Sequence, residues 1–311
     1  MKQISVYLLI VLFATVGIKI HAQCCSAGNP LSTESDLVNS GVKNLKIGVN
    51  YRHSFSNTFY SENQALEIGI IDKANYNFTD INLSYGIFHR ATLKAELGYF
   101  INKTEKYNIE NMNNAIGSGL GDASLQFRYL LYKSFTNKWE LSGGLGIKLP
   151  VGVFDQEVNN VKLPITVQPS SGSFKYFANA FFHKSKGNLA LYSLASIEVS
   201  QTIDSDNFYW KYGNVYALNT GAIYNWKNKL SAGIQLRGEL RERSSRENKQ
   251  TVEASGGFIM YCAPLLSAKI AKGYYAMCSI NIPVYKYVNV LQLTNAYSFS
   301  IGFQRKFNFD K

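Results

Sequence analysis

The chain lacks long apolar runs beyond its N-terminus. After the first 22 of its 311 residues, no segment holds the roughly 20 consecutive apolar residues that a membrane-spanning helix requires. A protein that crosses a membrane with helices is therefore excluded. If this chain crosses a membrane, it does so as strands.

Cysteine, histidine and clustered charge are scarce too. The chain has 4 cysteines, too few for a disulfide-stapled scaffold of this length, and no histidine beyond residue 22 stands at a ligand-like spacing from a cysteine pair. We therefore predict neither a metal site nor a cofactor. The cysteines are interpreted as ordinary small buried residues with an odd N-terminal pair: Cys24, Cys25, Cys262 and Cys278. The formal net charge is +11, but the bases are scattered along the chain, which argues against a nucleic-acid partner.

The first 22 residues show the charged, apolar and small-residue regions of a secretory signal in order. MKQ is followed by ISVYLLIVLFATVGI and then by KIHA. We predict a cleaved signal peptide over 1–22 and a periplasmic N-terminal segment over 23–41 that acts as a plug or tether. Lipidation at Cys24 is the alternative, although a small residue is expected before a lipidated cysteine and Gln23 stands there.

A glycine cluster opens the stretch GSGLGDASLQFRYLLYKS at residues 117–134. A dinucleotide-binding loop needs a strand before its glycines and a helix after them. Here polar residues precede the cluster, and apolar Leu125, Phe127 and Tyr129 then alternate with Gln126 and Arg128. A period of two indicates a strand, so the glycines are interpreted as a loop that enters a two-faced strand.

The same alternation recurs along the chain. We expect about 12 strands, near 42–55, 78–88, 91–103, 121–133, 138–150, 173–184, 188–201, 211–226, 229–242, 250–262, 273–285 and 296–309. Most exceed the roughly 5–6 residues of a soluble strand and suit a tilted membrane strand of roughly 9–11 residues.

The connections between these segments alternate in length. Short ones fall at FHR, KSFTN, KSKG and KNK, and longer polar ones fall at 56–77, 104–120, 151–172 and 202–210, whereas 262–272 fits neither class. Short turns on one side and long loops on the other are typical of outer-membrane barrels. The sequence therefore predicts an all-β fold over 42–311: a transmembrane, antiparallel, up-and-down β-barrel in the bacterial outer membrane.

Aromatic residues favour this barrel over a soluble β-sandwich, because a sandwich does not need them near its strand ends. Those expected to form the two membrane girdles are Tyr51, Tyr99, Tyr132, Trp139, Tyr224, Trp226, Phe307 and Phe309. The final FQRKFNFDK resembles the C-terminal strand by which the barrel-assembly machinery recognises its substrates, although Asp310 and Lys311 follow the last aromatic. The expected partners are this machinery, outer-membrane lipids and a small-molecule solute.

The motifs INLSYGIFHRATLKAELGYF, GLGDASLQFRYLLY, GGLGIKLPVG and INIPVYKYVN resemble outer-membrane transporters of the phenol-degradation meta-pathway, relatives of the long-chain fatty-acid channels. The resemblance covers roughly residues 78 to 309. It implies a barrel of about 12 strands with a passage for small, often hydrophobic or aromatic, compounds.

Strand parity predicts which side chains face the lumen. The candidates for lining it and setting selectivity are Lys46, Arg52, Lys94, Glu96, Asp122, Arg128, Glu140, Lys148, Arg237, Glu239 and Arg241, to which parity adds Glu198, Glu253 and Lys306. Among the lysines, arginines and glutamates of this set, eight bases face five acids, so an open lumen would favour anions. Alternatively, these charges pair across strands and fill a closed interior. Asp122 either shapes the mouth by bonding loop amides or is a structural turn residue.

Three function classes remain open from the sequence. A passive channel for small molecules is our first hypothesis, and a structural or adhesive barrel without an open path is the second. A lipid hydrolase is the third, since YRHSFSN at 51–57 contains His and Ser. In a strand, however, His53 shares a face with Phe55 while Ser54 and Ser56 point the other way, so we predict no catalytic residues and no enzyme.

Overall fold

The computed structural model describes residues 42–67, 70–109, 113–205, 208–227 and 229–309. The predicted signal peptide, the 23–41 segment, Cys24, Cys25, Asp310 and Lys311 lie outside these residues. The described chain is built of strands, with one 3-10 turn, η1 (Glu247–Lys249), and it contains no helix long and apolar enough to cross a membrane.

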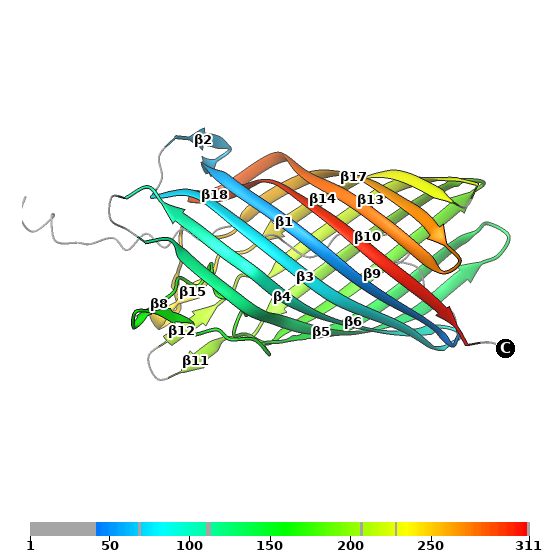
Figure 1. Ribbon diagram of the computed structural model, residues 1–311, viewed down its shortest axis with the longest axis horizontal. Coiled ribbons are helices and arrows are strands. Elements are labelled where there is room, and N and C mark those ends of the chain that lie inside the picture. Colours follow the sequence, from blue (N-terminus) through cyan, green and yellow to red (C-terminus); the bar gives the residue numbers. More distant parts are fainter. Residues whose placement is uncertain (1–41, 68–69, 110–112, 206–207, 228, 310–311) are drawn as a thin grey trace, which may run out of the picture.

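One antiparallel sheet closes on itself to form a barrel (Figure 1). Its strands are β1 (Asn44–Glu62), β3 (Ile71–Phe88), β4 (Ala91–Tyr107), β5 (Ala115–Ser134), β6 (Trp139–Leu149), β9 (Lys175–Lys186), β10 (Leu189–Ser200), β13 (Val215–Trp226), β14 (Leu230–Arg241), β17 (Gly257–Ala271) and β18 (Tyr274–Asn308). Neighbours in this order pair with one another, and β18 pairs with β1 to complete the ring.

The long strand β18 crosses the wall twice. Residues 274–288, the outgoing half, pair with β17, and residues 291–308, the returning half, pair with β1. The hydroxyls of Ser279 and Ser300 lie 2.7 Å apart, so the two halves run side by side. The turn between them includes Val290, whose φ is 55°. The eleven labelled strands of the ring therefore make twelve crossings, and the expectation of about 12 strands is confirmed.

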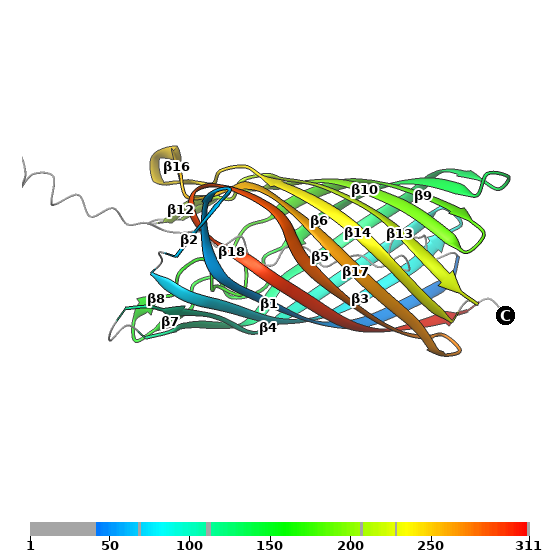
Figure 2. The ribbon, with the colours of Figure 1, turned by 90° about the horizontal axis from the view of Figure 1, so that it is seen from above.

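Connections at the two ends of the barrel differ as predicted. Short turns link the strands at the end where the chain finishes (Figures 1 and 2). The other end carries the longer loops and their short strands, which are β2 (Gln64–Leu66), β7 (Glu157–Val158), β8 (Val161–Lys162), β11 (Ile203–Ser205), β12 (Phe208–Lys211), β15 (Ser245–Arg246) and β16 (Gln250–Thr251). The β2 strand pairs with β1 outside the ring.

Several predicted boundaries were wrong because strands continue through polar sequence. The expected loops at 56–77 and 104–120 largely belong to β1, β3, β4 and β5, and the expected loop at the glycine cluster lies inside β5. The 262–272 segment is mostly part of β17, in which Pro264 takes an outward position opposite Ile234 of β14. Strand pairing with both neighbours outweighs the local turn signals of these segments.

The outer surface of the wall is apolar. Its exposed side chains include Ile81, Leu83, Leu97, Leu125, Phe127, Leu145, Leu236, Ile301 and Phe303. Inward neighbours on the same strands, such as Asp80, Arg128 and Gln235, are buried. An apolar exterior around a polar interior suits a barrel surrounded by lipid, and it places the chain in the outer membrane.

Two of the expected girdle residues lie inside strands rather than at their ends. Tyr51 and Tyr99 stand where the outward side chains change from apolar to polar: the Tyr51 hydroxyl donates to Asn77 Oδ1 at 2.7 Å, and Asn77 Nδ2 donates to Asn102 Oδ1 at 2.6 Å. The strands therefore extend beyond the apolar band on the loop side. At the short-turn end, Tyr132 stacks on Trp139 with ring centroids 4.6 Å apart, as a girdle requires.

Neighbouring positions on β14 test the two faces of the wall. The Leu236 side chain is 49% exposed on the outer surface, whereas Gln235 is 3% exposed and faces the lumen. An arginine on the lipid face near the bilayer midplane costs about 2–4 kcal/mol. We expect Leu236→Arg to assemble poorly and Gln235→Arg to assemble far better, measured as the heat-modifiable fraction in outer membranes. Equal assembly of the two variants would contradict the assignment of faces.

Candidate functional site in the barrel lumen

The lumen contains a cavity of about 390 Å³ toward the loop end, which we call the larger cavity. Wall strands from β1 round to β14 contribute its lining, and a segment of the loop between β6 and β9 covers it. The predicted lumen residues that line it are Arg52, Glu96, Asp122, Lys148, Glu198, Arg237, Glu239 and Arg241. These residues belong to six strands that lie far apart in the sequence, and strand parity predicts an inward position for each of them.

A smaller cavity of about 170 Å³ adjoins the first one, since both are lined by Arg52, Glu96 and Gln235. It adds two further predicted residues, Lys94 and Arg128. The two cavities therefore form one polar region that continues from the loop end toward the short-turn end.

Four of the predicted inward charges lie elsewhere. Lys46 is buried in β1 but lines neither cavity, and Glu140 pairs with Lys133 at 3.7 Å near a short turn. Glu253 was assigned wrongly: it is in the loop before β17, where it is exposed and pairs with Arg243 at 2.7 Å. Lys306 is exposed near the end of β18. Alternation within a strand cannot place a residue that belongs to a loop.

Residues 163–173, the inward loop, fold into the lumen instead of away from it. Val167 and Gln168 are buried, and Ser170 and Ser171 line the larger cavity. The Lys103 ammonium, from the wall strand β4, donates to the Gln168 carbonyl at 2.9 Å. The inward loop therefore narrows the barrel from inside.

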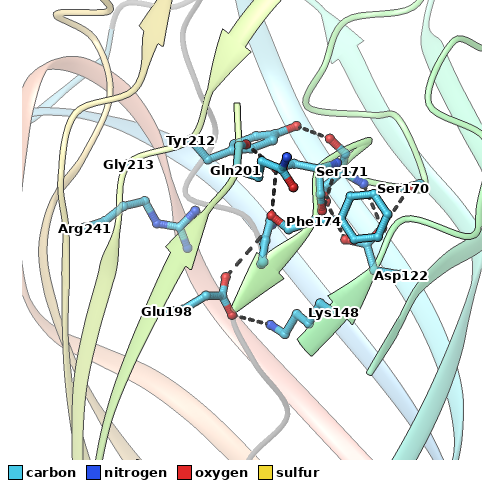
Figure 3. A network of polar contacts seen from close by, with 12 residues as sticks. Asp122, Lys148, Ser170, Ser171, Phe174, Glu198, Gln201, Tyr212, Gly213 and Arg241 are labelled. Atoms are coloured by element: carbon cyan, nitrogen blue, oxygen red, sulfur yellow. Dashed lines mark hydrogen bonds and ion pairs between the residues drawn. The ribbon is translucent and has the colours of Figure 1, made fainter. Parts of the chain in front are cut away.

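Asp122 holds the inward loop to the wall (Figure 3). Its Oδ1 accepts from Ser170 Oγ at 2.7 Å and from the Ser171 amide at 3.0 Å, and its Oδ2 accepts from Ser171 Oγ at 2.6 Å. Opposite it, the Tyr212 hydroxyl donates to the Ser171 carbonyl at 2.9 Å. Burial, together with the nearby Asp122 carboxylate, raises the pKa of Tyr212, so this phenol keeps the proton that it donates. Asp122 thus bonds an amide and two hydroxyls of the loop, and its role in shaping the mouth stays a prediction.

The glycine cluster has a packing role in this arrangement. A Cβ at Gly117 would lie 2.0 Å from the Val167 carbonyl oxygen, and a Cβ at Gly152 would lie 1.7 Å from the Leu120 carbonyl oxygen. Backbone approaches this close admit only glycine. Gly117 of the cluster and Gly152 of the loop therefore let the loop between β6 and β9 lie directly against β5.

Two ion clusters line the wall below the inward loop. Lys148 Nζ lies 2.6 Å from Glu198, and Lys175 Nζ lies 4.0 Å from the same carboxylate. Arg241 lies 3.0 Å from Glu239, which Arg237 also contacts. Figure 3 shows Lys148, Glu198 and Arg241 converging in one space below Tyr212. Each carboxylate is thus held by two bases, which leaves both clusters with a net positive charge.

Two bases of the cavity were missed from the sequence. A β-bulge between Phe100 and Lys103 reverses the alternation of β4 and turns Lys103 inward. Lys175 begins β9, where aromatic residues occupy both faces: Phe177 lines the cavity and Tyr176 is exposed. The pattern of polar and apolar residues on β9 therefore does not indicate which face of the strand points inward.

The lumen also contains an apolar cluster that the sequence analysis did not anticipate. Phe181, Tyr192, Ile223 and Leu265 pack together on inward positions, with Leu194 against them. The Arg128 guanidinium carbon lies 5.5 Å from the Phe181 ring centroid, within the range of a cation–π contact. Because Ile223 lies near the end of β13, this cluster lies on the short-turn side of the interior.

The structure separates the histidine and serines of YRHSFSN. His53 lies on the outer surface, with its ring centroid 5.4 Å from that of Phe299 and its Nδ1 2.8 Å from Asn77 Oδ1. Ser54 and Ser56 are buried on the inward side of β1. The imidazole and the hydroxyls are therefore on opposite faces of the wall, where they cannot act as base and nucleophile.

Metal-ligating side chains do not gather in the described part of the chain: it holds no group of three or more that could bind an ion. Cys262 and Cys278 are both free thiols, and they pair with the outward residues Leu236 and Leu266. The expectation that they are buried was wrong, because Cys262 is only half-buried and Cys278 is exposed on the outer face of the wall.

No protein-family model matches the sequence, and no curated protein matches it either. Among solved structures, an outer-membrane channel from Pseudomonas putida F1 aligns with a TM-score of 0.74 and 13% identity, over 90% of this chain and 100% of that one. A FadL homologue from Pseudomonas aeruginosa aligns with a TM-score of 0.47 and 8% identity, over 87% and 91% of the two chains. The first likeness shows the fold, that of a bacterial outer-membrane barrel.

The anchor at Asp122 predicts a change in conductance. A hydrogen bond to a charged group contributes about 1.5–3 kcal/mol, so losing even one shifts the balance between displaced and anchored loop by about tenfold or more. We expect Asp122→Ala to show larger and noisier single-channel currents than the parent protein. Asp72→Ala is the control, since Asp72 pairs with Lys106 on exposed strand ends. Unchanged currents in Asp122→Ala would show that the inward loop does not limit passage.

Proposed function

We propose that the protein is a passive channel for small molecules in the outer membrane. The observation that carries this proposal is the larger cavity, enclosed by the barrel wall and narrowed by an anchored loop. A barrel that served only as a scaffold would not need a charged, hollow interior held open beneath such a loop.

The size and lining of the lumen support passage of small solutes. A barrel of twelve crossings lies between the packed eight-strand and the open sixteen-strand cases. The larger cavity is lined by six bases, Arg52, Lys103, Lys148, Lys175, Arg237 and Arg241, and by four acids, Glu96, Asp122, Glu198 and Glu239. This excess of positive charge supports a preference for anions.

The sequence motifs that resemble the phenol-pathway transporters add an expectation about substrates. They favour small hydrophobic or aromatic compounds. Phe78, Phe100 and Phe177 line the same cavity as the charged residues, and this combination supports a solute with an apolar body.

A second candidate is a structural or adhesive barrel without an open path. Its supporting observation is the apolar cluster of Phe181, Tyr192, Ile223 and Leu265, which lies on the short-turn side of the lumen while the inward loop covers the other. Reconstitution distinguishes the two candidates, because only the channel conducts.

Ion selectivity tests the channel proposal. We expect the reconstituted protein to favour chloride over potassium, and Arg241→Gln to shift the reversal potential toward potassium because it removes one of the six bases. Arg237 remains as a partner for Glu239 in that variant. Lys106→Gln removes the same charge from an exposed position and serves as the control. Cation selectivity in the parent protein, or a complete lack of conductance over many reconstitutions, would refute the proposal in this form.

A further inference from the structure

The bases of the larger cavity stand beside aromatic rings. The Arg52 guanidinium carbon lies 5.3 Å from the centroid of Phe78, and the Lys103 ammonium lies 4.8 Å from that of Phe100. Phe78 and Phe100 themselves pack with centroids 4.7 Å apart. A ring face stabilises a cation without neutralising it. This part of the wall therefore offers positive charge and apolar surface at the same place.

Lys175 repeats this arrangement at the start of β9, which is separated from β4 by β5 and β6. Its ammonium lies 4.8 Å from the centroid of Tyr212 and 4.0 Å from Glu198. Lys148 holds the same carboxylate at the much shorter distance of 2.6 Å. Lys148 is thus the nearer partner of Glu198, and Lys175 is the second base of this cluster and lines the cavity.

We propose that the larger cavity binds a small aromatic carboxylate, with the carboxylate at Lys175 and Arg241 and the ring against Phe177 and the Phe78–Phe100 pair. This inference deepens the proposed channel function and rests on it. A neutral aromatic solute would make no use of the excess of bases over acids in the cavity lining. A purely inorganic anion would leave the aromatic wall without a partner.

The physical basis is that charge acts strongly in this confined space. Electrostatic attraction rises as the surroundings become less polarisable, and a lumen enclosed by protein and lipid is far less polarisable than water. Several bases on one wall raise the local concentration of anions further. Aromatic carboxylates combine the required charge with a planar apolar body, and the cavity volume of about 390 Å³ accommodates one.

Direct binding to the full-length, detergent-solubilised protein tests this inference without requiring passage. The probes are benzoate, its neutral analogue benzamide, and acetate, which has the charge but no ring. Titration calorimetry should show benzoate binding about tenfold or more tightly than either of the others, the effect of one charge-assisted hydrogen bond. Benzamide binding as tightly as benzoate would overturn the proposed recognition of charge, and acetate binding as tightly would overturn the role of the rings.

Variants locate the site. Lys175→Gln should weaken benzoate binding about tenfold, whereas Lys175→Arg should restore most of it. Glu198 keeps Lys148 as a partner in both, and the heat-dependent gel shift verifies that each variant is folded. Lys106→Gln, which removes an exposed base outside the cavity, should bind benzoate like the parent protein. Unchanged binding in Lys175→Gln would place the carboxylate elsewhere and overturn the assignment.

Conductance measured on the same preparations separates the two proposals. Benzoate binding without any current would contradict the proposed channel function but support the proposed binding site. A current without selective benzoate binding would overturn the proposed binding site but support the proposed channel function.

Discussion

The pairing of β1 with the returning half of β18 is the constraint on which the rest of the structure depends. Within a bilayer, an unpaired backbone amide or carbonyl has no water to bond with, so an open sheet edge is not tolerated. Joining the first and last crossings removes both edges at once. Closure also makes every strand two-faced, because one side must meet lipid and the other must meet the interior that the ring encloses.

The enclosed interior is too wide to be filled by the side chains of the wall alone and too narrow to remain a wide aqueous pore. The chain fills it in two ways. Apolar residues such as Phe181 and Ile223 pack across the short-turn side, and the inward loop enters from the other end. What is left between them is a polar space in which charged groups of opposite walls come close together.

Confinement explains the arrangement of charge in that space. Glu198 and Glu239 are each held by two bases, which lowers the cost of keeping a carboxylate away from bulk water. Because bases exceed acids in the lining, mutual pairing cannot neutralise all of them, and the proposed preference for anions rests on this excess. Asp122 differs from these carboxylates, since its partners are hydroxyls and an amide of the inward loop.

The sequence by itself determined the barrel, its twelve crossings and the lumenal side of Arg52, Asp122 and Arg237, because alternation within a strand is a local property of consecutive residues. Only the tertiary structure decided where β1 and β4 end, that a bulge turns Lys103 inward, and that Lys175 lines the cavity. It also decided the contacts of Asp122, whose partner Ser170 is 48 residues away in the chain. Such contacts form only when the ring closes and brings distant segments together, so no local pattern records them.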